Sequence, residues 1–137
     1  GMVERLMACT DVTFGCYRAG NGFQHLPLTE VVTRNEFFDY NAKYKGEVEE
    51  ITPARIPDDM AAQVQEQTER IYRLIGAKGI IRADYIISGG IPVLLEVNTT
   101  PGMTETSFIP QQVRAAGLNI SDVMTDIIEY EYNRLKK

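Results

Sequence analysis

The stretch Leu94–Ser107, LLEVNTTPGMTETS, decides the fold and the site that we predict for this chain. Its first residues favour a strand, on which Glu96 and Asn98 lie two positions apart and so leave the same face. Residues 99–102, TTPG, then end the strand in a sharp turn. A carboxylate and an amide oxygen on one face are hard ligands that suit Mg²⁺. The hydroxyl-bearing residues that follow suit an anionic substrate group: Thr104, Thr106 and Ser107.

The preceding strand is expected to place a second polar pair beside this one. Residues 79–88 predict a strand, and the SGG at 88–90 predicts a turn that leads into a returning strand. If this hairpin is symmetric about Gly90, Asp84 lies opposite Glu96 and Arg82 lies opposite Asn98. Two opposed carboxylates repel each other, so either a cation lies between them or Arg82 neutralises them. A solvated polar face is the alternative, which the uniformly apolar opposite face weakens. The residues of that opposite face are Ile81, Ala83, Tyr85, Val93, Leu95 and Val97.

The N-terminal half predicts further strands. Residues 11–17 alternate as a strand, and the GNG at 20–22 predicts a turn. Residues 26–32 return as the second arm, where Pro27 indicates an edge or a bulge, and residues 47–52 predict a third short strand. The segment 34–46 mixes aromatic and charged residues without a helix or strand period. It is interpreted either as a binding loop or lid, or as a surface crossover anchored by its aromatic rings.

Three helices are expected. The clearest spans 57–75, where Pro57 suits the first turn and Gly76 the end. Its predicted core stripe is Met60, Val64, Ile71 and Leu74 or Ile75. A short helix is expected over 106–116. A terminal helix is expected over 122–135, capped by Ser121. Its predicted buried side is Val123, Ile127, Ile128, Tyr132 and Leu135.

Length and charge narrow the class of function. The 137 residues make one small domain or a large piece of one. A net charge of −5 argues against a nucleic-acid surface but not against a nucleotide. No long apolar run or signal-peptide pattern is present in the sequence, and Cys9 and Cys16 are expected to be buried thiols of a cytoplasmic protein. Residues 1–2, Gly-Met, are interpreted as an expression scar.

Three segments carry a family resemblance. Residues 82–117, RADYIISGGIPVLLEVNTTPGMTETSFIPQQVRAAG, strongly resemble the C-terminal part of D-alanine–D-alanine ligases, of the ATP-grasp superfamily. FFDYNAKY at 37–44 is similar to the family's lid-like loop, and VERLMACTDVT at 3–13 to its adenine-side strand and linker. The resemblance implies an α+β fold for residues 3–137: the C-terminal portion of an ATP-grasp unit, with a mainly antiparallel sheet packed against helices. The family's N-terminal domain and glycine-rich phosphate loop are not found in this sequence.

The resemblance also implies a reaction. The carboxylate of one D-alanine attacks the γ-phosphate of ATP, and the amine of a second D-alanine then attacks the acyl phosphate. By position, Asp84, Glu96 and Asn98 would hold two Mg²⁺ ions, with Mn²⁺ as an alternative. Arg82 and the backbone N–H of Gly102 would stabilise the charge that builds on the phosphoryl group and the tetrahedral intermediate.

The resemblance assigns the remaining site residues by position. Ser107 would bind the carboxylate of the second D-alanine, and Lys43 would reach toward phosphate. Tyr44 favours an amide product over an ester with D-lactate. On the nucleotide side, Asp11 stands where the family usually has a longer glutamate for the ribose. The residues implied around adenine are Glu4, Arg5, Leu6 and Met7.

The sequence leaves rival functions open. A related ligase using D-serine or D-lactate as acceptor would keep the metal and phosphate residues and differ around Tyr44, Met103 and Ser107. A non-catalytic nucleotide- or metal-binding module is the alternative from another class, although such modules usually lose a metal ligand. If the protein is a D-alanine–D-alanine ligase, as the resemblance implies, we expect a role in peptidoglycan precursor synthesis and a homodimeric full-length protein. We expect the chain as given to be inactive alone.

Overall fold

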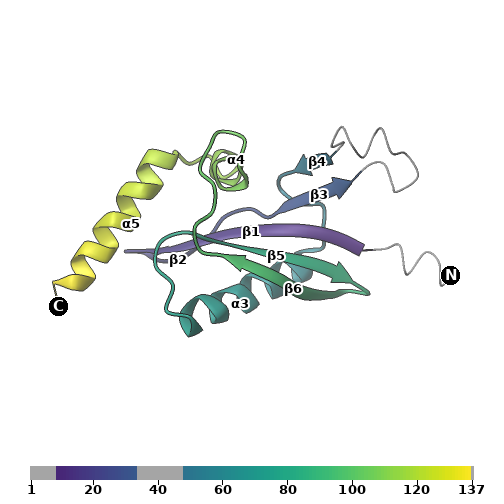
Figure 1. The fold of residues 1–137 in the computed structure, drawn as a ribbon, viewed down its shortest axis with the longest axis horizontal. Coiled ribbons are helices and arrows are strands. Elements are labelled where there is room, and N and C mark those ends of the chain that lie inside the picture. Colours follow the sequence, from purple (N-terminus) through teal and green to yellow (C-terminus); the bar gives the residue numbers. More distant parts are fainter. Residues whose placement is uncertain (1–8, 34–47, 137) are drawn as a thin grey trace.

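The computed structural model describes residues 9–33 and 48–136, which form a twisted antiparallel sheet with helices on both faces (Figure 1). Its main path runs β4–β3–β1–β5–β6, and β2 also pairs with β1. All the pairs in this part of the chain are antiparallel. The strands are β1 (Cys9–Ala19), β2 (Gly22–His25), β3 (Thr29–Thr33), β4 (Val48–Ile51), β5 (Ile81–Ser88) and β6 (Ile91–Asn98).

Strand β1 is the centre of the sheet and is longer than the 11–17 expected. Six consecutive residues in it are buried, which is the pattern of a strand covered on both faces. The predicted turn at Gly20 is confirmed, but the predicted single returning arm over 26–32 is wrong. Instead β2 and β3 both pair with the same side of β1, on either side of a break that contains Pro27. Proline has no N–H for the ladder, which is why the arm is interrupted there.

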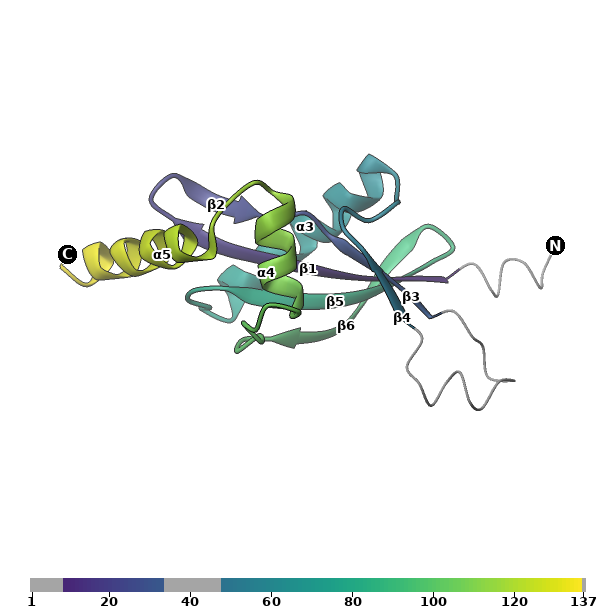
Figure 2. The ribbon, with the colours of Figure 1, turned by 90° about the horizontal axis from the view of Figure 1, so that it is seen from above.

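The three helices within residues 48–136 divide between the two faces of the sheet (Figures 1 and 2). Helix α3 (Asp58–Leu74) covers one face and encloses a core of residues from β1 and β5, with Phe14 and Tyr85 at its centre. Helices α4 (Phe108–Ala115) and α5 (Ile120–Leu135) cover the other face and form a second core. The centre of the sheet is therefore enclosed from both sides, while β6 lies at its edge.

The buried stripe of α3 differs from the predicted one. Met60 and Val64 are buried as expected, but Thr68 and Tyr72 complete the stripe, and Leu74 is 86% exposed. The stripe runs at intervals of four, which turns Leu74 away from the sheet. Thr68 is accepted in the core because its hydroxyl lies 2.7 Å from that of Tyr85 and donates to the Val64 carbonyl at 2.7 Å.

Helix α5 begins with a different cap and buries less than expected. Asn119, not Ser121, caps it, since the Asn119 side chain accepts hydrogen bonds from the N–H groups of Ser121 and Asp122. Val123 and Ile127 are buried as predicted. The C-terminal half of the helix extends past the end of the sheet (Figure 1), so the expected burial of three more residues is wrong. These exposed residues are Ile128, Tyr132 and Leu135.

The two cysteines differ in their exposure to solvent. Cys16 is a core residue, and burial raises the pKa of its thiol, whereas Cys9 is exposed, contrary to expectation.

Among the helices described, none has the length and apolar character needed to cross a membrane.

Candidate active site

The β5–β6 hairpin places the predicted polar residues with the help of an irregularity. Gly89 and Gly90 both have positive φ, +59° and +77°, as the tight hairpin turn between Ser88 and Ile91 requires. From that turn alone, Asp84 would lie opposite Leu95. The ladder shifts between Asp84 and Tyr85, and one extra residue on β6 brings Glu96 opposite Asp84. The predicted pairing is therefore confirmed, but the assumed symmetry about Gly90 is wrong.

This bulge also changes the apolar face of β6. Beyond it, Leu94 rather than Leu95 pairs with Tyr85 and packs against the α3-side core. Val93 and Leu95 are 48% and 59% exposed. The expectation that Val93 and Leu95 share the apolar face of Tyr85 is wrong, because a shift of one residue moves each side chain to the other face.

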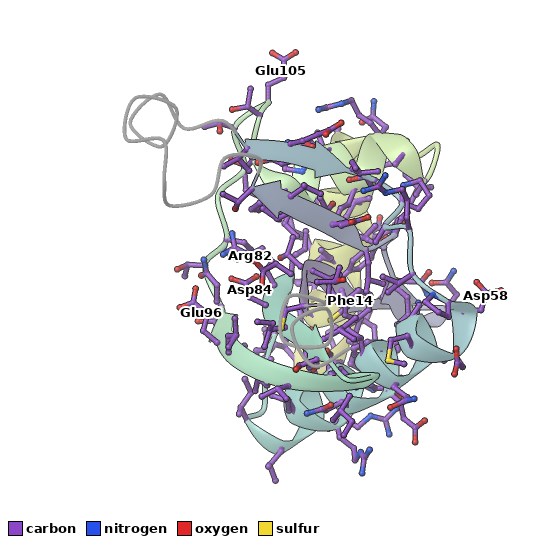
Figure 3. The ribbon with its side chains drawn as sticks, turned by 90° about the vertical axis from the view of Figure 1, so that its right-hand side faces the viewer. Phe14, Asp58, Arg82, Asp84, Glu96 and Glu105 are labelled. Atoms are coloured by element: carbon purple, nitrogen blue, oxygen red, sulfur yellow. The ribbon has the colours of Figure 1, made fainter. Side chains whose placement is uncertain are left out.

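Arg82, Asp84 and Glu96 form a compact charged group at the edge of the sheet (Figure 3). The Arg82 guanidinium donates through Nε and Nη2 to the two Asp84 carboxylate oxygens, each at 3.0 Å. The same Nη2 lies 3.9 Å from a Glu96 oxygen. The positive charge of Arg82 therefore offsets part of the repulsion between the two opposed carboxylates. This is one of the two arrangements that the sequence predicts. Such a paired geometry gives the guanidinium a defined orientation.

Two residues that the sequence analysis did not single out complete this group. Thr13 of β1, which pairs with Asp84, donates its hydroxyl proton to Asp84 Oδ1 at 2.7 Å. The ring of Phe108, the first residue of α4, lies 5.3 Å from the Arg82 guanidinium carbon. Alternation along β1 could have placed Thr13 on the face of Asp11. Neither contact could be found without knowing which strand or helix lies beside β5.

Asn98 and the turn after β6 form the next part of the site. Asn98 pairs with Arg82 across the hairpin, and its Oδ1 accepts a hydrogen bond from the Thr100 N–H at 2.9 Å. Farther on, the Ser107 hydroxyl lies 2.7 Å from that of Thr104. A side chain on Gly102 would meet the Ser107 oxygen at 2.9 Å, so Gly102 and Ser107 lie against each other only because Gly102 has no Cβ.

The oxygen donors of this site fit a hard divalent cation. No three His, Cys, Asp or Glu side chains cluster within residues 9–33 and 48–136. The predicted set instead combines the carboxylates of Asp84 and Glu96 with the Asn98 amide oxygen. The Asn98 amide oxygen accepts the Thr100 N–H at 2.9 Å and the Thr100 hydroxyl at a long 3.5 Å, and carboxylate oxygens accept more than one partner. This is the donor chemistry that Mg²⁺ prefers.

The nucleotide-side predictions are only partly covered by the structure. Asp11 is exposed on β1, and it lies on the same face as Thr13. It therefore shares the face that carries Asp84. The other predicted nucleotide and loop residues lie outside the described residues: Glu4, Arg5, Met7, Lys43 and Tyr44.

Comparison with known proteins identifies the family. The family described as D-ala D-ala ligase C-terminus matches residues 2–129. The chain belongs to this family. A D-alanine–D-alanine ligase of Parabacteroides distasonis is 62% identical over 136 residues, 98% of the chain and 41% of that protein. A Bacteroides fragilis ligase is 61% identical over 132 residues, 96% of the chain and 41% of that protein. The chain thus spans about two-fifths of the curated relatives that it matches.

Solved structures agree with this family assignment. A D-alanine–D-alanine ligase from Bacillus anthracis complexed with ATP matches with a TM-score of 0.74 and 31% identity, over 93% of the chain and 41% of that protein. The VanG D-Ala:D-Ser ligase from Enterococcus faecalis matches with a TM-score of 0.70 and 28% identity, over 88% of the chain and 36% of that protein. The predicted α+β fold, the C-terminal portion of an ATP-grasp ligase, is therefore confirmed.

Proposed function

We propose that the full-length protein containing this chain joins two D-alanines with ATP, through a D-alanyl phosphate, to make a peptidoglycan precursor. The observation that carries this proposal is the pairing of Asp84 with Glu96 across the hairpin, with Arg82 between them. This pairing occurs in a chain whose sequence is about three-fifths identical to those of proteins named D-alanine–D-alanine ligase. A homodimeric full-length protein belongs to the same proposal.

Asp84, Glu96 and Asn98 are proposed to hold two Mg²⁺ ions. Bound there, the metal would screen the negative charge of the ATP phosphates and orient the group being transferred. Of this set, Asp84 is held most firmly, because Arg82 and Thr13 both donate hydrogen bonds to it. Glu96 has a 65% exposed side chain and no comparable restraint from Arg82 at 3.9 Å, so it is free to turn toward an incoming ligand.

Arg82 and the loop that leads into α4 are proposed to handle the reacting groups. The Arg82 guanidinium is held by Asp84 and by the Phe108 ring, which prepares it to stabilise charge on a phosphoryl group without reorganising. The backbone N–H of Gly102 would donate to the same oxyanion. Ser107, at the start of α4, would bind the carboxylate of the second D-alanine.

The remaining assignments follow the family positions. Lys43 would contact phosphate and Asp11 the ribose, and Tyr44 would favour an amide product. The residues proposed to bind adenine are Glu4, Arg5 and Met7. A ligase with D-serine as acceptor is the second candidate, favoured by the match to the VanG D-Ala:D-Ser ligase. A non-catalytic module is disfavoured, because the acids and the arginine are all present.

The test uses the full-length protein with ATP, Mg²⁺ and D-alanine, D-serine or D-lactate as acceptor. We expect D-alanyl-D-alanine as the main product. Glu96→Gln should lower kcat by about 10²-fold or more and raise the Mg²⁺ concentration needed, because a charged ligand is lost. Glu66→Gln is the matched control, because Glu66 is exposed on α3, on the other face of the sheet. This substitution should change neither kcat nor the Mg²⁺ requirement. No product with any acceptor would refute the proposal, and preference for D-serine would favour the second candidate.

A further inference from the structure

Gln112 is a fully buried polar side chain in α4 that the proposed chemistry does not use. Its Oε1 accepts a hydrogen bond from the Gly15 N–H at 3.0 Å. Its Nε2 donates to the Thr13 carbonyl and to the Thr29 hydroxyl, each at 3.0 Å. These partners lie 83 to 99 residues away along the chain, in β1 and β3. The amide therefore fastens α4 to the middle of the sheet, where an unmade hydrogen bond is costly.

The backbone of β1 is shaped to receive this helix. A Cβ on Gly15 would lie 2.7 Å from Gln112 Oε1 and would overlap Ile109 Cδ1, so α4 rests directly on the strand. Gly15 pairs with Arg82 on β5, and the Arg82 guanidinium lies over Phe108 at the start of the same helix. The N-terminal half of α4 thus packs on β1 through Ile109, and Phe108 contacts Arg82 of the neighbouring strand β5.

Thr13 is hydrogen-bonded both to Gln112 and to Asp84 of the charged group. Its carbonyl accepts the Gln112 hydrogen bond, and its hydroxyl donates to Asp84 Oδ1. At the other end, Ser107 is the N-cap of α4, and its side chain makes no capping hydrogen bond to the described residues. An eight-residue helix without a side-chain cap has little stability of its own. Its position depends on what fastens it to the sheet.

We propose that Gln112 is a positioning residue that fixes the distance between the two halves of the active site. One half is Asp84, on the metal and phosphate side; the other is Ser107, on the acceptor side. The inference rests on the proposed function for those two roles. Gln112 touches no substrate. It acts by holding α4 against Gly15 and Thr13, so that the acceptor carboxylate is presented at the right distance from the reacting phosphate.

The experiment replaces Gln112 in the full-length protein with Met, which has a similar size but cannot make these hydrogen bonds. Initial rates with varied D-alanine give separate constants for the two D-alanines. We expect the KM of the second D-alanine to rise about tenfold, since small displacements of positioning groups have effects of this order. The KM of ATP should change less than twofold. Gln63→Met is the matched control, because Gln63 is exposed on α3, on the other face of the sheet, and it should leave both constants unchanged.

Two results would overturn the inference. In the first, Gln112→Met lowers the melting temperature but leaves the acceptor KM at the wild-type value. In the second, the KM values of ATP and acceptor rise together. If the Met variant does not fold, Thr29→Val replaces it, because it removes one hydrogen-bond partner of Gln112 at nearly constant volume; a smaller rise in the acceptor KM with an unchanged ATP KM is expected. A wild-type protein that forms no D-alanyl dipeptide refutes the proposed function itself, and this inference with it.

Discussion

Gly15→Ala is the substitution for which the structure allows the most detailed prediction. The new methyl group would lie 2.7 Å from Gln112 Oε1 and 3.2 Å from Leu26 Cδ1, and would overlap Ile109 Cδ1. All three neighbours are buried, so none can turn out into solvent. Gly15 does not have positive φ, which means that alanine causes no backbone strain there and the whole effect comes from packing.

The magnitude follows from two contributions. Overpacking a close-packed core costs about 1–3 kcal/mol. Displacing Gln112 also weakens the buried Gly15 N–H hydrogen bond, which costs about 1–3 kcal/mol if it is left unsatisfied. The lower conformational entropy of the unfolded alanine chain offsets about 0.4–1 kcal/mol. We therefore expect a net loss of about 1–5 kcal/mol, which is large beside the roughly 5–15 kcal/mol typical of a native protein.

The assay is urea-induced unfolding, followed by far-ultraviolet circular dichroism. Gly20→Ala is the matched control, because a Cβ at Gly20 meets nothing within 4 Å and its φ is not positive; its free energy of unfolding should change by less than about 0.5 kcal/mol. Adding Ile109→Val to Gly15→Ala removes the overlapping Cδ1 and should restore part of the loss. Equal stabilities for the two glycine variants would refute the packing described here.

The other predictions concern pH, the bulge and the extent of the chain. Hydrogen bonds from Arg55 lower the pKa of the Glu30 carboxyl below its usual 4.5, so the pair stabilises the fold at neutral pH and this stabilisation fades as the pH falls below about 4.5. The difference in urea midpoint between wild type and Glu30→Gln should therefore shrink in acid, and a constant difference would contradict it. Deleting Leu95, the extra residue of the bulge, should leave Glu96 opposite Asp84 in a regular ladder, so the full-length protein should keep D-alanine-dependent phosphate release; loss of that release in a folded variant would show that the bulge itself is required. The 137-residue chain alone, assayed with ATP, Mg²⁺ and D-alanine, should release no phosphate, since its relatives are more than twice as long; release at the full-length rate would show otherwise.

The sequence predicted best what depends on neighbours along the chain. The GG turn joins two strands of complementary pattern, and it was enough to place Asp84 and Glu96 on one hairpin. The first long helix was located within a residue at each end by Pro57 and Gly76. The prediction of its buried stripe was less accurate, because apolar residues at helical spacing are compatible with more than one buried face. Only packing against the sheet shows that Thr68 and Tyr72 are buried and Leu74 is not.

By itself, then, the sequence determined the family, the hairpin and the set of polar residues that we propose as the site, since each is encoded in a short contiguous motif. Tertiary structure alone decided how that site is supported. The bulge at Leu95 shifts a register by one, and the hydrogen bonds from Thr13 to Asp84 and from Gly15 to Gln112 join segments up to 97 residues apart. Pairings of this kind depend on which surfaces pack together, and a local pattern carries no information about a partner so distant along the chain.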